Sequence, residues 1–146
     1  MKTRELGSVI LYVLFGVILA LAINFGLALA LNTDLPIVAV QSNSMVPTFH
    51  KGDILVLVGV SPEELKVGDI IVFSPSERAT PVVHRIIKIN DDGTFQTKGD
   101  ANNQQLPFEK RIKPEQIHGK CVLIIPYLGW IKIIFIDLIT LGGTIK

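Results

Sequence analysis

Apolar residues in this sequence form one long run near its start and several short runs after it. The long run covers residues 8–31, carries no charge and has only Ser8 and Asn24 as polar interruptions. As an α-helix it extends roughly 36 Å, compared with about 30 Å for the hydrocarbon core of a bilayer. The pattern therefore predicts a transmembrane helix.

A cleaved signal sequence is the alternative interpretation of this run, because Lys2 and Arg4 precede it. The apolar part of such a sequence is only about 7–15 residues long, so the uninterrupted length favours an anchor that is retained. The same two cations favour a cytoplasmic N-terminus, which places the chain from residue 34 onward outside.

The short runs that follow are rich in β-branched residues and are bounded by Gly, Pro, Asp and Asn, which is typical of strands separated by turns. The Asp-Gly of NDDGT at 90–94 tolerates the positive φ angles of a hairpin turn. We therefore predict a mainly β protein, with a compact antiparallel β domain behind the N-terminal helix. The predicted strands are 36–40, 53–60, 69–73, 81–89, 94–98 and 120–125.

A second apolar stretch, LGWIKIIFIDLITLGG at 128–143, is shorter and is interrupted by Lys132 and Asp137. It fits a short membrane segment or a helix in the interface, and Tyr127 and Trp130 at its start are typical of the interfacial belt. The predicted organisation is a cytoplasmic N-terminus and anchor at 1–33, an extracytoplasmic β domain at 34–126, and a membrane-associated segment at 127–146.

Composition and charge narrow the classes of function. Hydrophobic residues make up 49% of the 146 residues, which is high for a purely soluble domain. Residues 34–120 hold ten Lys/Arg and eleven Asp/Glu, so no basic stripe points to nucleic acid. The lone Cys121 excludes an intramolecular disulfide, and we expect neither a metal nor a cofactor.

The turn-prone stretch QSNSMVPTFHKGD at 41–53 places serines close to the end of the anchor. A serine hydroxyl is inert at neutral pH unless a neighbouring base takes its proton. His84 lies inside an apolar strand and, taken alone, fits a hydrogen-bonded strand histidine better than a catalytic one. Asp100 follows the fifth strand, and the hairpin can bring it beside His84, as the acid of a triad with Ser44.

Five motifs in order strengthen the catalytic interpretation: SNSMVPTF followed by GD, then GDIIVF, VVHRI, TKGDANN and GKCVLIIPYLG. Behind an N-terminal transmembrane helix, they resemble type I signal peptidases of the archaeal and endoplasmic-reticulum subgroup, over roughly residues 8–130. The resemblance implies a Ser44 nucleophile and a His84 general base, where most eubacterial members have lysine. It also implies an oxyanion hole formed by the Ser42 hydroxyl and the Ser44 backbone N–H.

The same resemblance assigns the remaining apolar residues of this stretch to the substrate cleft. Ordinary packing of an apolar loop is the alternative for each of them. The residues expected to shape or rim the cleft are Met45, Pro47 and Phe49.

Two positions depart from the family pattern. Asn43 stands where glycine is common, and asparagine tolerates the unusual backbone angles that glycine permits. Subgroup members carry a second aspartate after the first, often as the triad acid, whereas this chain has Leu106 there. Either Asp100 is the acid, or Glu109 reaches the imidazole from a loop shifted by Pro107, or the site works as a Ser/His dyad. We favour Asp100.

The resemblance implies a membrane-bound serine endopeptidase that removes N-terminal signal peptides from secreted precursors after small-x-small sites. It would lie in the cell membrane as a single-pass or two-pass protein, with its catalytic domain on the extracytoplasmic face. Its expected partners are signal-peptide-bearing precursors, the lipid bilayer and the protein-translocation machinery.

Two alternatives remain open at this point. One is a catalytically degenerate, membrane-tethered β domain that binds extended peptides or partner proteins. The other is a self-cleaving peptidase of the repressor type, which would use lysine as its base and lack a membrane helix. Lys51 and Lys66 are the candidate lysine bases, and both fit solvated turn residues better.

Overall fold

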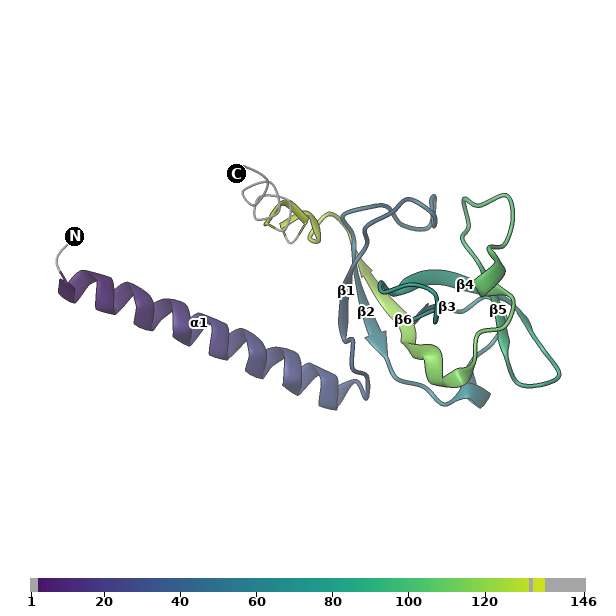
Figure 1. The fold of residues 1–146 in the computed structure, drawn as a ribbon, viewed down its shortest axis with the longest axis horizontal. Coiled ribbons are helices and arrows are strands. Elements are labelled where there is room, and N and C mark those ends of the chain that lie inside the picture. Colours follow the sequence, from purple (N-terminus) through teal and green to yellow (C-terminus); the bar gives the residue numbers. More distant parts are fainter. Residues whose placement is uncertain (1–2, 132, 136–146) are drawn as a thin grey trace.

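The computed structural model describes residues 3–131 and 133–135 of the chain. Helix α1, Thr3–Ala30, projects away from a β-sheet domain (Figure 1). Its segment Glu5–Ala30 is long and apolar enough to cross a membrane, by length and composition, and its most apolar stretch is not buried inside the protein. An uncovered apolar helix of this length is unfavourable in water and favourable in lipid.

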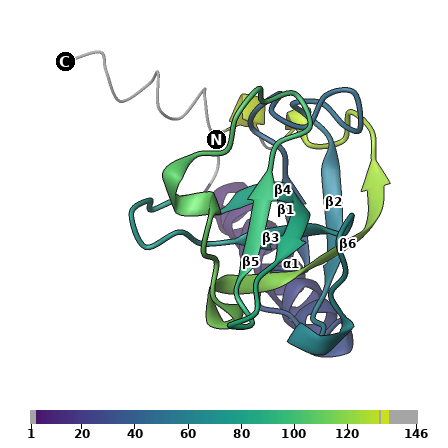
Figure 2. The same cartoon turned by 90° about the vertical axis from the view of Figure 1, so that its right-hand side faces the viewer.

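Six strands form one antiparallel sheet in the order β1-β2-β6-β3-β4-β5, and Figure 2 shows α1 behind it. Strand β6 joins the two halves of the sheet, since it pairs with β2 on one side and with β3 on the other. The strands are β1 Ile37–Ala39, β2 Ile54–Val58, β3 Ile70–Phe73, β4 Val82–Ile89, β5 Phe95–Lys98 and β6 Ile117–Ile125. Single 3₁₀ turns lie at η1 Pro62–Glu64, η2 Pro107–Glu109 and η3 Pro114–Gln116.

The predicted mainly β fold is confirmed, and the first five predicted strands lie within one or two residues of the observed ones. The predicted hairpin turn is also present, with Gly93 at a φ of 78°. The sixth strand starts earlier than predicted, at Ile117, although glycine at 119 breaks the apolar pattern. Gly119 pairs with Val72, and a Cβ on it would lie only 2.7 Å from the Val58 carbonyl oxygen, so close backbone approach explains the glycine.

Two clusters of buried apolar side chains share strand β3. Ile71 and Phe73 belong to the first cluster and Val72 to the second, because successive side chains of a strand point to opposite faces. Strand β3 is therefore buried on both faces. Each fully buried large apolar side chain contributes about 1.5–3 kcal/mol. The first cluster holds Leu65, Ile71, Phe73, Val82, Ile86, Phe95 and Ile112, and the second holds Val40, Met45, Phe49, Leu55, Leu57 and Val72.

The chain after β6 turns back against the loop before β2. The Gly129 N–H donates to the Gly52 carbonyl at 2.8 Å, and a Cβ on Gly52 would lie 2.0 Å from Nε1 of Trp130. Residues 130–131 and 133–135 are helical and leave the sheet on the side from which α1 projects (Figure 1). The remainder of the predicted membrane-associated segment, residues 132 and 136–146, lies outside the described residues.

Candidate active site

The serine loop, residues 41–50, connects β1 to β2 and is fastened to the core by two apolar side chains. Met45 is 1% exposed and Phe49 is 2% exposed, and both belong to the second core cluster. The Thr48 N–H closes a turn by donating to the Met45 carbonyl at 2.8 Å. Ser44, which is half-buried, is therefore held next to packed side chains.

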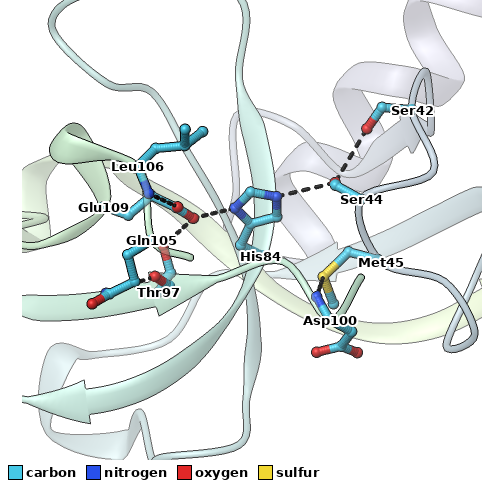
Figure 3. A network of polar contacts seen from close by, with 9 residues as sticks. All are labelled: Ser42, Ser44, Met45, His84, Thr97, Asp100, Gln105, Leu106 and Glu109. Carbon is cyan, nitrogen blue, oxygen red and sulfur yellow. Dashed lines mark hydrogen bonds and ion pairs between the residues drawn. The ribbon is translucent and has the colours of Figure 1, made fainter. Parts of the chain in front are cut away.

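His84 comes from β4, where Val82, His84 and Ile86 alternate toward the interior. Its Nε2 atom lies 3.0 Å from the Ser44 Oγ, within hydrogen-bond distance. Residues forty positions apart in the sequence are thus brought together, and Figure 3 shows the Ser44 side chain directed toward the imidazole.

The partner of the other ring nitrogen is Glu109, at the end of η2. Its carboxylate is fully buried and is hydrogen-bonded to His84 Nδ1. The same carboxylate accepts from the Leu106 N–H at 2.6 Å and from the Thr97 hydroxyl at 3.3 Å. A buried carboxylate is stable only when such donors replace water. Glu109, one of three alternatives in the sequence, is therefore the carboxylate that contacts the imidazole.

Asp100 does not contact the imidazole, which corrects the geometry expected from the sequence. Its carboxylate points away from His84 (Figure 3) and pairs with Arg85, with Nε–Oδ1 and Nη2–Oδ2 distances of 2.9 and 2.6 Å. The Thr48 hydroxyl donates to the same carboxylate at 2.5 Å. The physical reason is the rigid guanidinium fork of Arg85, which matches a carboxylate bidentately. Asp100 thus ties the serine loop to β4.

This ion pair changes the protonation of both partners. The hydrogen bonds from Arg85 hold the pKa of the Asp100 carboxyl below its ordinary value, and the hydrogen bond to Asp100 raises the pKa of the Arg85 guanidinium. A carboxyl whose pKa is lower in the folded than in the unfolded chain stabilises the fold above its unfolded pKa. That contribution is lost as the pH falls through the folded-state pKa.

We therefore expect Asp100→Asn to lower the Tm of the full chain at neutral pH, and the difference from wild type to shrink below about pH 4. Thermal unfolding of the two proteins across a pH series measures this. A Tm difference that stays constant into strong acid would contradict it.

Gly99, which the sequence analysis did not single out, allows the close approach of the loop and the base. A Cβ there would lie 2.6 Å from the Ser44 carbonyl oxygen and 2.8 Å from Nε2 of His84. Next to it, the Ala101 N–H donates to that Ser44 carbonyl at 2.9 Å. A side chain at 99 would therefore push the two reactive groups apart.

The other predicted site residues divide into two groups. Ser42 is exposed, and its hydroxyl lies 3.2 Å from the Ser44 Oγ. Met45 and Phe49 are buried in the core, and Pro47 is exposed. Buried side chains present no surface to a substrate, so the expectation that Met45 and Phe49 line the cleft gives way to the packing alternative.

Comparisons with known proteins bear on this arrangement. The family model described as signal peptidase, peptidase S26, matches residues 8–111. The signal peptidase complex catalytic subunit SEC11C of Homo sapiens and of Mus musculus is 36% identical, over 94% of this chain and 76% of the relative. The catalytic subunit sec11 of Dictyostelium discoideum is 35% identical, over 84% of this chain and 74% of the relative.

The span matched by the family model contains most of α1, the serine loop, His84 and Glu109. It agrees with the resemblance drawn from the five sequence motifs. This chain therefore belongs to the peptidase S26 family of signal peptidases.

Proposed function

We propose that this protein is a membrane-anchored serine endopeptidase that removes signal peptides from precursor proteins, with Ser44 as nucleophile, His84 as general base and Glu109 as the acid that orients the base. The observation that carries the proposal is the hydrogen-bonded chain from the Ser44 Oγ through both ring nitrogens of His84 to the Glu109 carboxylate. Hydroxyl, imidazole and carboxylate in this order form the constellation of a catalytic triad.

The reaction proceeds in two stages. The Ser44 Oγ attacks the carbonyl carbon of the scissile bond while Nε2 of His84 takes its proton. The Glu109 carboxylate stabilises the imidazolium that results and keeps the Nδ1 proton in place. Nε2 then protonates the leaving amine, the C–N bond breaks, and an acyl-enzyme remains on Ser44. Water, activated by the same imidazole, hydrolyses that ester and restores the serine.

The oxyanion of each tetrahedral intermediate needs donors near Ser44. We assign this role to the Ser42 hydroxyl, which lies 3.2 Å from the Ser44 Oγ, and to the Ser44 backbone N–H. Donors placed in advance stabilise developing charge without reorganisation, which is why a single oxyanion donor is worth on the order of 10²–10³ in rate.

Helix α1 supports a location at a membrane. Its uncovered apolar surface supports a role as a membrane anchor, and the first described residues of the C-terminal segment leave the sheet on the same side. We propose that the domain lies on the extracytoplasmic face, where the small-residue cleavage site of a precursor emerges while its apolar segment remains in lipid. Since the relatives are named as subunits of a signal peptidase complex, we further propose that it acts beside the translocation machinery.

The test uses the full chain in lipid vesicles and two precursors. The first carries a signal peptide that ends in Ala-x-Ala, and the second differs only in having Phe as its last residue before the cut. We expect mass spectrometry to find one mature product from the first precursor and none from the second. Equal cleavage of both would contradict selection of small residues. Cleavage of neither by the folded protein would favour a tethered domain that binds peptides without cutting them.

A further inference from the structure

The joint, residues 31–36, connects the end of α1 to β1 and is packed directly on the sheet domain. The Leu31 carbonyl accepts from the Gly59 N–H, just after β2, at 2.8 Å. A Cβ on Gly59 would lie 1.7 Å from the Asn32 carbonyl oxygen, so the two backbones touch where only glycine fits. The helix therefore ends against the domain without an intervening flexible linker.

Thr33, in the middle of the joint, bonds to both the helix and the sheet. It is 8% exposed, and its N–H donates to the Ala28 carbonyl of α1 at 3.1 Å. Its hydroxyl donates to the His118 carbonyl of β6 at 2.7 Å and accepts from the Leu35 N–H at 3.2 Å. The direction of the last helical turn is thus linked to the start of β6.

The His118 imidazole adds a second link to the same joint. Its Nδ1 lies 2.8 Å from an Asp34 carboxylate oxygen, and its Nε2 lies 2.7 Å from the hydroxyl of Ser74, which follows β3. At the far end of the joint, the Pro36 carbonyl accepts from the Leu57 N–H at 3.0 Å. Both ring nitrogens are therefore used to connect the juxtamembrane carboxylate with the sheet.

Ser74, His118 and Asp34 repeat the order of groups in a catalytic triad, but their surroundings do not suit hydrolysis. The Ser74 N–H donates to the Gln116 carbonyl at 2.8 Å, and the next residue, Pro75, has no N–H. Neither the Ser74 backbone nor the Pro75 backbone thus has an N–H available for an oxyanion. The cluster holds segments together.

We propose that Thr33, Asp34 and His118 are positioning residues that hold the catalytic domain at a fixed height and angle on its membrane helix, and thereby determine which peptide bond of a membrane-inserted precursor reaches Ser44. This inference rests on the proposed function. The precursor is itself held in the bilayer by its apolar segment, so the position of Ser44 relative to the lipid selects the residue at which the precursor is cut.

The lengths involved make such selection sensitive to the joint. A flexible chain of the same six residues would have an end-to-end spread of roughly 13 Å. An extended precursor advances only about 3.3 Å per residue, so a flexible connection would expose about four consecutive peptide bonds to the nucleophile. The bonded joint removes this spread.

The test compares two substrates of the full chain in lipid vesicles: a short soluble peptide that spans the cut, and the same cut within a membrane-inserted precursor. The variant Thr33→Val combined with Asp34→Ala removes the hydroxyl and the carboxylate from the joint. The single variant Thr33→Ser keeps a hydroxyl at this position. Arg111→Ala, which removes an exposed ion pair with Asp92 outside the joint, is the matched control.

We expect the double variant to cleave the soluble peptide with kcat/KM within about twofold of wild type. Cleavage of the precursor at the wild-type bond should fall about fourfold, because the nucleophile would then reach about four consecutive peptide bonds. Mass spectrometry of the mature protein should find several N-termini in place of one. Thr33→Ser and Arg111→Ala should give the wild-type ratio and a single N-terminus.

Two outcomes would overturn the inference. An unchanged site and ratio in the double variant would show that the joint does not select the bond, and equal losses on both substrates would assign it a general structural role. If the double variant loses its thermal transition, Asp34→Ala alone decides by the same criteria, because its carboxylate is 64% exposed and its removal leaves no cavity. Failure of the wild type on the soluble peptide would instead contradict the proposed function.

Discussion

Replacing Ser44 with alanine is expected to reduce signal-peptide cleavage to background while the protein remains folded. In serine proteases, loss of the nucleophile costs on the order of 10⁶-fold in kcat. The Ser44 Oγ is the atom 3.0 Å from the base, and no second hydroxyl lies at that imidazole among the contacts of the described residues. The measurement is single-turnover cleavage of a precursor by equal amounts of wild type and variant in lipid vesicles, with Tm as the check on folding.

Variants of two other serines serve as an intermediate case and a control for this result. Ser42→Ala should retain the nucleophile and lose one oxyanion donor, so we expect an intermediate loss of about 10²–10³-fold. Ser76→Ala changes an exposed serine away from the loop and should behave as wild type. Full cleavage by Ser44→Ala would leave the mechanism without a nucleophile, whatever the other two variants do.

Glu109→Gln is expected to cause the second-largest loss, on the order of 10⁴-fold in kcat, by analogy with amide substitution of the buried triad acid in other serine proteases. The reason lies in the donors around it. If the amide oxygen remains on His84 Nδ1, its NH₂ group meets the Leu106 N–H, a donor against a donor. If the amide is turned over, its NH₂ donates to Nδ1 and forces the proton onto Nε2, which can then no longer accept from Ser44.

Asp100→Asn is the matched comparison. It makes the same chemical change in the carboxyl that the sequence analysis favoured as the triad acid. We expect a much smaller loss of kcat, since the Asp100 carboxylate bonds to Arg85 and Thr48 and acts on the serine loop only through them. Steady-state cleavage of a soluble peptide by the two variants measures the difference. A greater loss in Asp100→Asn than in Glu109→Gln would return the acid to Asp100.

The part of the site carried by regular structure could be predicted from the sequence, and the part carried by turns could not. His84 lies on a strand whose β-branched residues and alternation are visible in the sequence, and Ser44 lies in a motif. Glu109 lies at the end of a single 3₁₀ turn, whose direction depends on contacts with Thr97 and Leu106. No periodicity reveals such a turn in advance.

Leu106 shows why motif spacing misled the choice of acid. Its side chain cannot orient an imidazole, so the sequence analysis treated this position as a departure from the family pattern. In the structure its backbone N–H donates to Glu109 at 2.6 Å. The position supplies a donor that every residue except proline possesses, while the carboxylate comes from three residues further on. The side-chain types at positions 106 and 109 alone do not reveal that the carboxylate comes from the second position and a backbone donor from the first.

The serine loop illustrates a different limit. Apolar residues in a polar stretch suit either a rim for substrate or an attachment to the core, and both need the same amino acids. Met45 and Phe49 are attachments because the second cluster extends beneath the loop. That cluster is assembled from segments far apart in the sequence, so it is a property of the whole fold.

Strand β3, covered by side chains on both faces, has a consequence for local opening of the protein. Amide hydrogens buried this way exchange with deuterated solvent only when the molecule unfolds as a whole, whereas loop amides exchange through small fluctuations. His84 is on β4, which pairs directly with β3, whereas Ser44 is on a loop. We therefore expect the backbone around His84 to open less often than the exposed residues 41–43 of the serine loop.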